Sequence, residues 1–362
     1  MKKVFIAATK QNDGKTTVSL GLICNFQKKF KRVGFIKPIG QRYLEEEGLK
    51  IDEDSILVEE VCGFKCGLKD MSPIAVEKGF TEKYILRPDK KSITRQIQDS
   101  FRRISQKQNL VVIEGTGHAG VGSVFDHSNA TVAKLLGAKV IIISSGGVGR
   151  PIDEVVLNKA LFEKEGVKVL GAIINKVLPD KFEKINRLVR SGLERKGINV
   201  LGVISYNPML ARPTIEQILD DSDFQVLTGS EFLEAEVSRV IVGAMEPLDA
   251  IKYITNDSLM ITPGDRQDMI MTALSCFRDT PDKRPRICGI VLSGGIIPEP
   301  PIMNMLEQSH IPVLLAKSDT YDVATHIHDL TVKIRPCDKN KINAVVKLIR
   351  DHVDLDKILK GI

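Results

Sequence analysis

Tryptophan is absent from this sequence, and aromatic residues make up only 5% of its 362 residues. Proteins that bind single-stranded nucleic acid commonly stack the bases on aromatic side chains, so this scarcity argues against a nucleic-acid partner. Long apolar runs are missing too, because no stretch approaches the roughly 18 residues that a membrane-spanning helix needs. We therefore expect neither nucleic acid nor a membrane as a partner.

Closely paired cysteines are also rare. The six cysteines are scattered and include no C-x-x-C motif, and Cys62 and Cys66 are the only close pair. This pattern argues against a disulfide framework and against a four-ligand zinc site, and it favours reduced thiols.

The chain begins Met1-Lys-Lys and continues directly into an apolar segment, without the features of a signal peptide. We expect a cytoplasmic protein.

The charge of the chain changes sign near residue 216. Before Glu216 there are 36 basic and 23 acidic residues, whereas from Glu216 onward there are 16 basic and 23 acidic ones. The positive charges are dispersed, so a bound nucleotide suits the basic part better than nucleic acid does. Since the length suits two domains, we expect a nucleotide-binding domain over 1–215 followed by an acidic domain.

The most informative stretch joins an apolar segment, 4–8, to a segment with helical apolar spacing, 18–26. The loop between them ends in Gly14-Lys15-Thr16, as in the phosphate-binding motif G-x-x-x-x-G-K-[ST]. Such a loop directs backbone N–H groups and a helix N-terminus at a polyphosphate. In this arrangement Lys15 reaches the terminal phosphates and the Thr16 hydroxyl binds Mg²⁺. The candidate nucleotide-binding residues of the loop are Thr9, Lys10, Gln11, Asn12, Asp13, Gly14, Lys15, Thr16 and Thr17.

Thr9 stands where that motif has its first glycine. In this respect the loop resembles the variant P-loops of dethiobiotin synthetase and of the Min and Par partitioning ATPases. The partitioning ATPases carry a second lysine early in the loop, and Lys10 has that position. Their lysine contacts nucleotide across a subunit interface, so the resemblance implies a homo-oligomer, either a dimer or a larger assembly.

Two further candidate side chains stand at the ends of predicted strands. The segment 32–39 places Lys37 directly before Pro38, and four apolar residues precede Glu114. In open α/β sheets the carboxyl ends of the strands form the ligand-binding edge. We predict that Glu114 is a carboxylate for Mg²⁺. Lys37 is either a residue of the site or a lysine that merely ends its strand.

The segment 51–61 has apolar residues at helical spacing behind Asp52 and Asp54, which are favourable residues for the N-terminus of a helix. The resemblance to dethiobiotin synthetase offers a second interpretation, because an aspartate at the position of Asp54 helps to hold Mg²⁺ in that family. The same family has a similar Lys-Pro step whose lysine contacts reacting groups. Together with the motif and the strand ends, the resemblance makes Thr16, Asp54 and Glu114 the candidate metal ligands, and Lys15 and Lys37 the candidate catalytic residues.

A strand predicted within 167–177 ends in Asn175 and Lys176. The amide of an asparagine can donate and accept hydrogen bonds together, which suits recognition of a base. The synthetase family uses such an asparagine for adenine, so the resemblance implies that Asn175 binds ATP. The alternative is an exposed loop asparagine.

The acidic part alternates strand-like and helix-like segments, which indicates a small parallel α/β sheet. It resembles the DRTGG domain, named for a loop that here reads Gly264-Asp-Arg-Gln-Asp268. Asp265 and Arg266 either contact a ligand or form a turn held by its own ion pair. We expect this domain over 216–345 and a C-terminal helix or tail over 346–362. His326 and His328 are expected on one face of a strand.

The predicted fold class is therefore α/β. It consists of a P-loop NTPase domain of the SIMIBI type, with helices on both faces of a parallel sheet, and of a small DRTGG domain. The two resemblances together match the N-terminal part of long phosphate acetyltransferases. Those enzymes carry acetyl transfer in a further domain for which this chain has no room, so we do not expect an acetyltransferase.

The function that we expect is a regulatory or switch ATPase with ATP and Mg²⁺ as cofactors. One alternative is an ATP-dependent ligase of the dethiobiotin synthetase or cobyrinic acid a,c-diamide synthase type, which acts on a carboxylate or an amine. Gly40, Gln41 and His118 depart from the synthetase pattern and argue against biotin chemistry itself. A second alternative is a nucleotide sensor that hydrolyses nothing.

Overall fold

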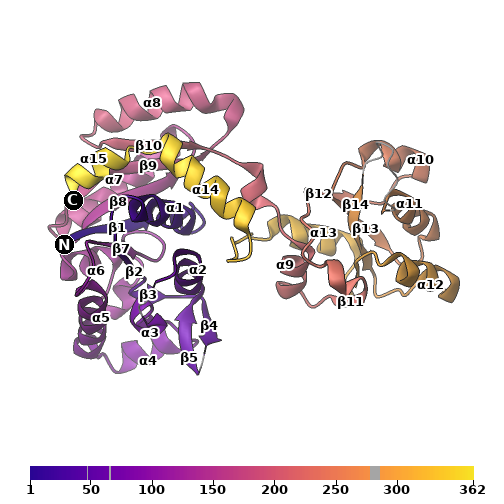
Figure 1. The fold of residues 1–362 in the computed structure, drawn as a ribbon, viewed down its shortest axis with the longest axis horizontal. Helices are drawn as coiled ribbons and strands as arrows, with labels where there is room; N and C mark the ends of the chain where they lie inside the picture. Colours follow the sequence, from indigo (N-terminus) through magenta and orange to yellow (C-terminus); the bar gives the residue numbers. More distant parts are fainter. Residues whose placement is uncertain (47, 65–66, 278–285) are drawn as a thin grey trace. The chain divides into compact units, whose positions relative to one another are not determined.

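The chain folds into two units in the computed structural model, which describes residues 1–46, 48–64, 67–277 and 286–362 (Figure 1). The first unit comprises Met1–Asn207 together with Ile334–Ile362, and the second comprises Pro208–Lys333. The second unit is thus an insertion into the first. The two units divide after Asn207 and before Ile334, while the expected domain limits at 215 and 345 stay predictions. Cys66, one of the close cysteine pair, lies outside the described residues.

A six-stranded parallel sheet forms the centre of the first unit, in the order β10-β9-β8-β1-β7-β2. Its strands are almost continuously apolar because helices cover both faces of the sheet. The predicted parallel α/β fold is confirmed. The strands are β1 (Lys2–Ala8), β2 (Val33–Ile36), β7 (Leu110–Glu114), β8 (Lys139–Ser145), β9 (Val169–Val177) and β10 (Val200–Ser205).

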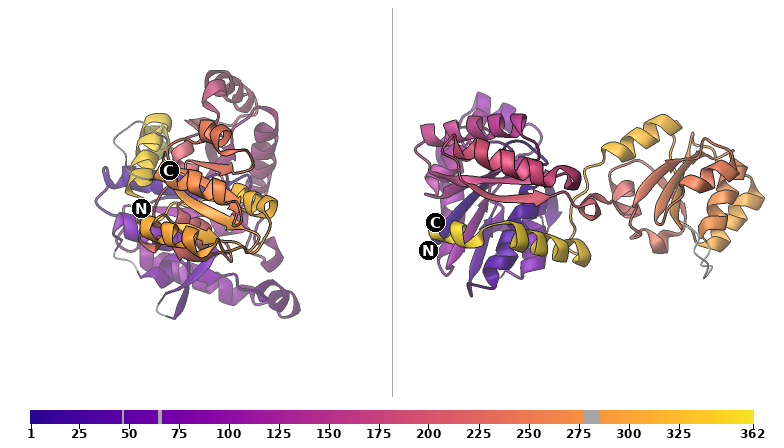
Figure 2. Two further views of the ribbon diagram at one scale, coloured as in Figure 1. Left: turned by 90° about the vertical axis from the view of Figure 1, so that its right-hand side faces the viewer. Right: turned by 90° about the horizontal axis from the view of Figure 1, so that it is seen from above.

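Helices pack on each side of this sheet, as Figure 2 shows for α7 and α8 on one side and α14 and α15 on the other. Two small sheets, β3–β6 and the hairpin β4–β5, complete the unit. The helices of the first unit are α1 (Lys15–Gln27), α2 (Glu53–Cys62), α3 (Leu68–Met71), α4 (Phe80–Leu86), α5 (Lys90–Ser105), α6 (Asn129–Leu135), α7 (Gly149–Lys164), α8 (Phe182–Glu194), α14 (Lys339–His352) and α15 (Leu355–Gly361). The short strands are β3 (Ile39–Gly40), β4 (Tyr43–Glu46), β5 (Leu49–Asp52) and β6 (Ile74–Ala75).

The C-terminal segment belongs to the first unit because α14 packs closely against α1. Gly21 makes room for this contact, since a Cβ atom there would lie 2.3 Å from Cγ1 of Ile349. Asn25 also donates a hydrogen bond from Nδ2 to the Val346 carbonyl oxygen at 3.0 Å. The end of the chain is therefore bound to the helix that follows the phosphate-binding motif.

The second unit contains a five-stranded sheet in the order β11-β15-β14-β13-β12. Four of its strands are parallel, as predicted for this part of the chain, and β11 pairs with β15 in the antiparallel direction. Separate apolar clusters cover its two faces. The elements are β11 (Gln225–Thr228), β12 (Arg239–Val242), β13 (Ser258–Pro263), β14 (Ile287–Ser293), β15 (Val313–Leu315), α9 (Ile215–Asp220), α10 (Pro247–Ala250), α11 (Gln267–Phe277), α12 (Pro300–Ser309) and α13 (Thr320–Asp329).

Two local expectations for the second unit meet different outcomes. The strand expected at His326 and His328 is wrong, because both residues lie in α13, whose N-terminus Asp319 caps through its carboxylate. In the loop after β13 the ion pair of Arg266 is made with Asp268 of α11 and not with Asp265, since Arg266 Nη2 lies 2.9 Å from Asp268 Oδ2. In addition, no helix in the described part of the chain is long and apolar enough to cross a membrane.

Candidate functional site

The loop between β1 and α1 is held by its own side chains. Asp13 is almost fully buried, and its Oδ2 accepts hydrogen bonds from the Thr9 hydroxyl at 2.7 Å and from the Lys10 backbone N–H at 3.0 Å. The Thr9 hydroxyl also lies 3.1 Å from Glu154 Oε2. Thr9 thus replaces the first glycine of the motif with a side chain that fixes the loop from inside.

Gly14 lets the loop enter α1. Its φ of +90° lies in the left-handed region, which residues with a Cβ atom rarely adopt. A Cβ atom at Gly14 would also lie 2.3 Å from Nδ2 of Asn175. Lys15, Thr16 and Thr17 then form the first turn of α1. The backbone therefore turns sharply at the point where a phosphate-binding loop must meet its helix.

Two residues at the end of β9 hold the loop from the other side. Asn175 donates from Nδ2 to the Asp13 carbonyl oxygen at 2.9 Å, and Lys176 donates from Nζ to the Asn12 carbonyl oxygen at 2.7 Å. Asn175 was predicted as a residue of the site, although its amide nitrogen here contacts the loop and its role toward adenine stays a prediction. The supporting role of Lys176 was missed. The sequence did offer a signal for this role, because Lys176 directly follows Asn175 at the same strand end.

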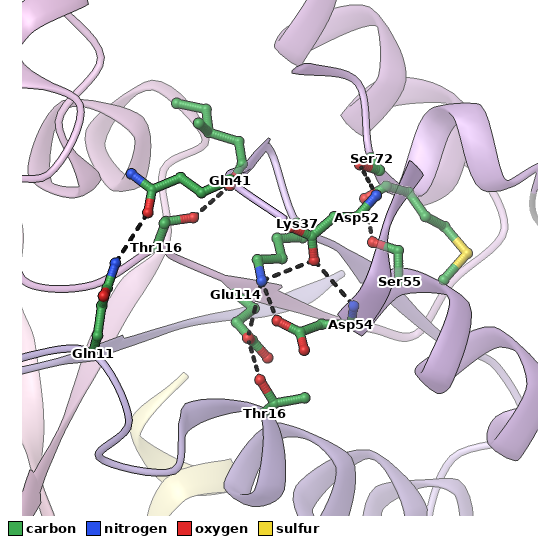
Figure 3. A network of polar contacts seen from close by, with 12 residues as sticks. Gln11, Thr16, Lys37, Gln41, Asp52, Asp54, Ser55, Ser72, Glu114 and Thr116 are labelled. Atoms are coloured by element: carbon green, nitrogen blue, oxygen red, sulfur yellow. Dashed lines mark hydrogen bonds and ion pairs between the residues drawn. The ribbon is translucent and has the colours of Figure 1, made fainter. Parts of the chain in front are cut away.

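Four charged residues meet beside Thr16 and form what we call the carboxylate cage: Lys37, Asp52, Asp54 and Glu114 (Figure 3). The ammonium group of Lys37 lies 2.9 Å from Asp52 Oδ1 and 3.8 Å from Glu114 Oε1, and it also contacts the Asp54 carboxylate. The Thr16 hydroxyl donates to Glu114 Oε1 at 3.0 Å. The structure therefore brings together Thr16, Asp54 and Glu114, the three candidate metal ligands.

The sequence left open whether Asp52 and Asp54 cap a helix or belong to the site. In the structure, Asp52 caps the helix and Asp54 lies in the cage. The Asp52 carboxylate accepts a hydrogen bond from the Asp54 backbone N–H at 3.0 Å and so caps α2. The Asp54 side chain instead contacts Lys37. The helix consequently begins after Asp52, and the residues expected at its start, Ile51 and Asp52, end strand β5.

The charges of the cage act strongly on one another. Burial lowers the pKa of Lys37, but the carboxylates of Asp54, Asp52 and Glu114 outweigh it and raise the pKa above the usual value. Burial and the neighbouring Asp54 raise the pKa of Glu114 to about 7, against the opposite effect of Lys37. Burial also lowers the pKa of Lys15; Glu114 opposes this effect and Lys37 adds to it. The cage therefore needs positive charge to keep all of its carboxylates ionised.

The donor set of the cage fits a hard divalent cation. Its atoms are carboxylate and hydroxyl oxygens, which are the ligands that Mg²⁺ prefers. Asp52 Oδ2 and Glu114 Oε2 are buried and have no hydrogen-bond partner among the described residues. Since buried polar atoms are normally paired, these oxygens fit a group that the protein part alone does not supply.

The remaining candidates of the loop lie toward its surface. Gln11 and Asn12 are exposed and Lys10 is half-buried. Gln11 donates from Nε2 to Gln41 Oε1 at 3.2 Å, which links the loop to the segment between β3 and β4 (Figure 3). The roles of Lys10, Gln11 and Thr17 toward a nucleotide stay predictions.

The raised pKa of Glu114 predicts a pH dependence of stability in the nucleotide-free protein with EDTA. The pKa rises from 4.5 to about 7 on folding, so the folded state holds a proton that the unfolded state releases. The resulting stabilisation is full below the unfolded pKa and is lost as the pH rises through about 7. We expect the wild type to lose more unfolding free energy than Glu114→Gln between about pH 5 and pH 8 in urea titrations. Equal losses in the two proteins would contradict this.

Two protein families match the chain. The AAA domain family AAA_26 matches residues 2–214, and the DRTGG domain family matches residues 217–330. The chain is also similar to proteins named phosphate acetyltransferase. That of Synechocystis sp. is 27% identical over 368 residues, which cover 98% of this chain and 51% of the relative. That of Pseudomonas putida is 26% identical over 371 residues, with 98% and 51% covered.

Solved structures show weaker similarity. The septum site-determining protein MinD of Pyrococcus horikoshii, complexed with Mg-ADP, has a TM-score of 0.37 at 14% identity and covers 58% of this chain and 83% of its own. The CBS and DRTGG domains of Clostridium perfringens pyrophosphatase have a TM-score of 0.27 at 16% identity, with 38% and 60% covered.

The chain spans about half the length of the curated relatives that it matches. The family matches place the loop between β1 and α1 and the carboxylate cage in the AAA domain, and the loop at Arg266 in the DRTGG domain. Because the first match covers more than half of the sequence, the protein belongs to the AAA_26 family of AAA domains, carries a DRTGG domain behind it, and is related to the N-terminal region of phosphate acetyltransferases.

Proposed function

We propose that the first unit binds Mg²⁺ and ATP and that the protein works as a regulatory or switch ATPase. The observation that carries this proposal is the position of Lys15 and Thr16, at the start of α1, beside the carboxylates of Asp54 and Glu114. Phosphoryl transfer in such sites needs positioned positive charge more than covalent chemistry. Lys15 would neutralise phosphate oxygens, while Thr16, Asp54 and Glu114 would hold Mg²⁺.

Further features support ATP as the ligand and a homo-oligomeric assembly. Asn175 stands at the end of β9 next to Gly14, and its resemblance to the adenine-binding asparagine of the synthetase family favours ATP. Lys10 is half-buried, and its resemblance to the second lysine of the partitioning ATPases favours a homo-oligomer in which it contacts a partner's nucleotide. The DRTGG domain would then respond to the nucleotide state.

A ligase is the second candidate, favoured by the position of Lys37 at the ligand edge of the sheet. In a ligase that lysine would contact the reacting groups of a second substrate. Its ammonium group is instead enclosed by Asp52, Asp54 and Glu114, which favours the ATPase. Turnover with a candidate carboxylate or amine would separate the ligase from the ATPase, and measured hydrolysis of ATP would separate the ATPase from a pure sensor.

The first test compares the unfolding midpoint with and without Mg·ATP for the wild type and Lys15→Ala. Ligand at about 100 times its dissociation constant stabilises the folded state by roughly 2.7 kcal/mol. We expect the wild type to show such a rise and Lys15→Ala to lack it. Lys164→Ala, which changes an exposed lysine at the end of α7, is the matched control and should respond like the wild type. The absence of any rise in the wild type would refute ATP binding.

A further inference from the structure

Lys37 is a buried cation held by three carboxylates at once. Its side chain is 9% exposed, whereas those of Asp52, Asp54 and Glu114 are 2%, 15% and 0% exposed. The three carboxylates come from β5, α2 and β7, so the fold itself gathers them around one ammonium group. Figure 3 shows this group beside the carboxylates of Asp54 and Glu114, with the Glu114 carboxylate between it and Thr16.

This ammonium group contacts oxygens that a metal ion would use. Asp54 and Glu114 are partners of Lys37 and also candidate ligands of Mg²⁺, so the lysine and the metal compete for them. Removing one member of a buried group of charges leaves the others uncompensated, which costs far more than loss of an exposed ion pair. Without Lys37 the cage would hold three carboxylates with little exposure to water, and Lys15 would still act on Asp54 and Glu114.

We propose that Lys37 is the resident counter-ion of the carboxylate cage and keeps the cage from binding a divalent cation until a nucleotide arrives. The inference rests on the proposed function, because the nucleotide phosphates supply the remaining ligands of the cation. Mg²⁺ is usually bound through one or two carboxylates together with substrate phosphates. Cation binding by this protein is therefore conditional on nucleotide, and Lys37 is the residue that makes it so.

The test measures Mn²⁺ binding to the nucleotide-free protein by electron paramagnetic resonance, which reports the free Mn²⁺ directly. Lys37→Met removes the charge and keeps a similar length of side chain. We expect the wild type to bind Mn²⁺ weakly and Lys37→Met to bind it at least ten-fold more tightly. Lys37→Met/Asp54→Asn should bind weakly again. Lys50→Met is the matched control, because Lys50 pairs with the exposed Glu77 outside the cage.

Equal Mn²⁺ affinity of the wild type and Lys37→Met would overturn the inference, and so would tight Mn²⁺ binding by the nucleotide-free wild type. If Lys37→Met does not fold in EDTA, added Mn²⁺ should restore its cooperative unfolding, and failure to restore it would equally overturn the inference. A different result would refute the proposed function. Wild-type protein that Mg·ATP does not stabilise refutes ATP binding, whereas the Mn²⁺ comparison without nucleotide still decides the role of Lys37.

Discussion

Gly14→Ala is expected to abolish the stabilisation of the protein by Mg·ATP and to lower its unfolding free energy by about 1–3 kcal/mol. The φ of +90° disfavours any residue with a Cβ atom. The new atom would also lie 2.3 Å from Asn175 Nδ2, so the asparagine must move and release the Asp13 carbonyl oxygen. Urea titrations give the stability, and thermal unfolding with and without Mg·ATP gives the response to nucleotide.

Gly149→Ala is the control for this substitution. Gly149 is the first residue of α7 and has no positive φ, and a Cβ atom there would have no neighbour within 4 Å among the described residues. Its replacement should therefore change neither stability nor binding. The double variant Gly14→Ala/Asn175→Ala removes the collision but keeps the unfavourable φ, so it should regain part of the stability and none of the binding. Normal binding of Mg·ATP by Gly14→Ala would show that nucleotide does not bind at this loop.

The positions of the candidate site residues were largely predictable because these residues stand at the ends of strands. Parallel strands bring their carboxyl ends to one edge, so the motif after β1 and the residues Lys37, Glu114 and Asn175 could be placed together from one-dimensional patterns. The role of Asp54 came only from the resemblance, since capping explains an aspartate before a helix equally well. What the sequence could not show is how completely the carboxylates enclose Lys37.

Other features depend on contacts between distant parts of the chain or on overlooked local signals. The return of α14 to the first unit rests on its packing against Gly21 of α1, and no local pattern announces such a partner. The prediction of a strand at His326 and His328 overlooked a helix-start signal in the sequence. Asp319, directly before Thr320, is a favourable N-cap, and its carboxylate accepts from the Asp322 backbone N–H at 3.0 Å.

Gly264→Ala is expected to destabilise the second unit by about 3 kcal/mol or more. A Cβ atom at Gly264 would lie 1.8 Å from the Ile296 carbonyl oxygen and 2.6 Å from its carbon. This neighbour is backbone and cannot rotate away as a side chain can. The loop cannot easily shift either, because Arg266 pairs with Asp268 and donates from Nη2 to the Met245 carbonyl oxygen at 3.2 Å.

The measurement is thermal unfolding of the full chain, in which Gly264→Ala should separate an early transition from a later one. Because the second unit is an insertion with its own two apolar clusters, its loss leaves the core of the first unit in place. The later transition should therefore still rise with Mg·ATP. Asp265→Ala alters the next residue, which is exposed, and should change stability by no more than about 0.5 kcal/mol. A wild-type melting curve for Gly264→Ala would contradict the close contact with Ile296, whereas loss of the Mg·ATP response would mean that the nucleotide site needs a folded DRTGG domain.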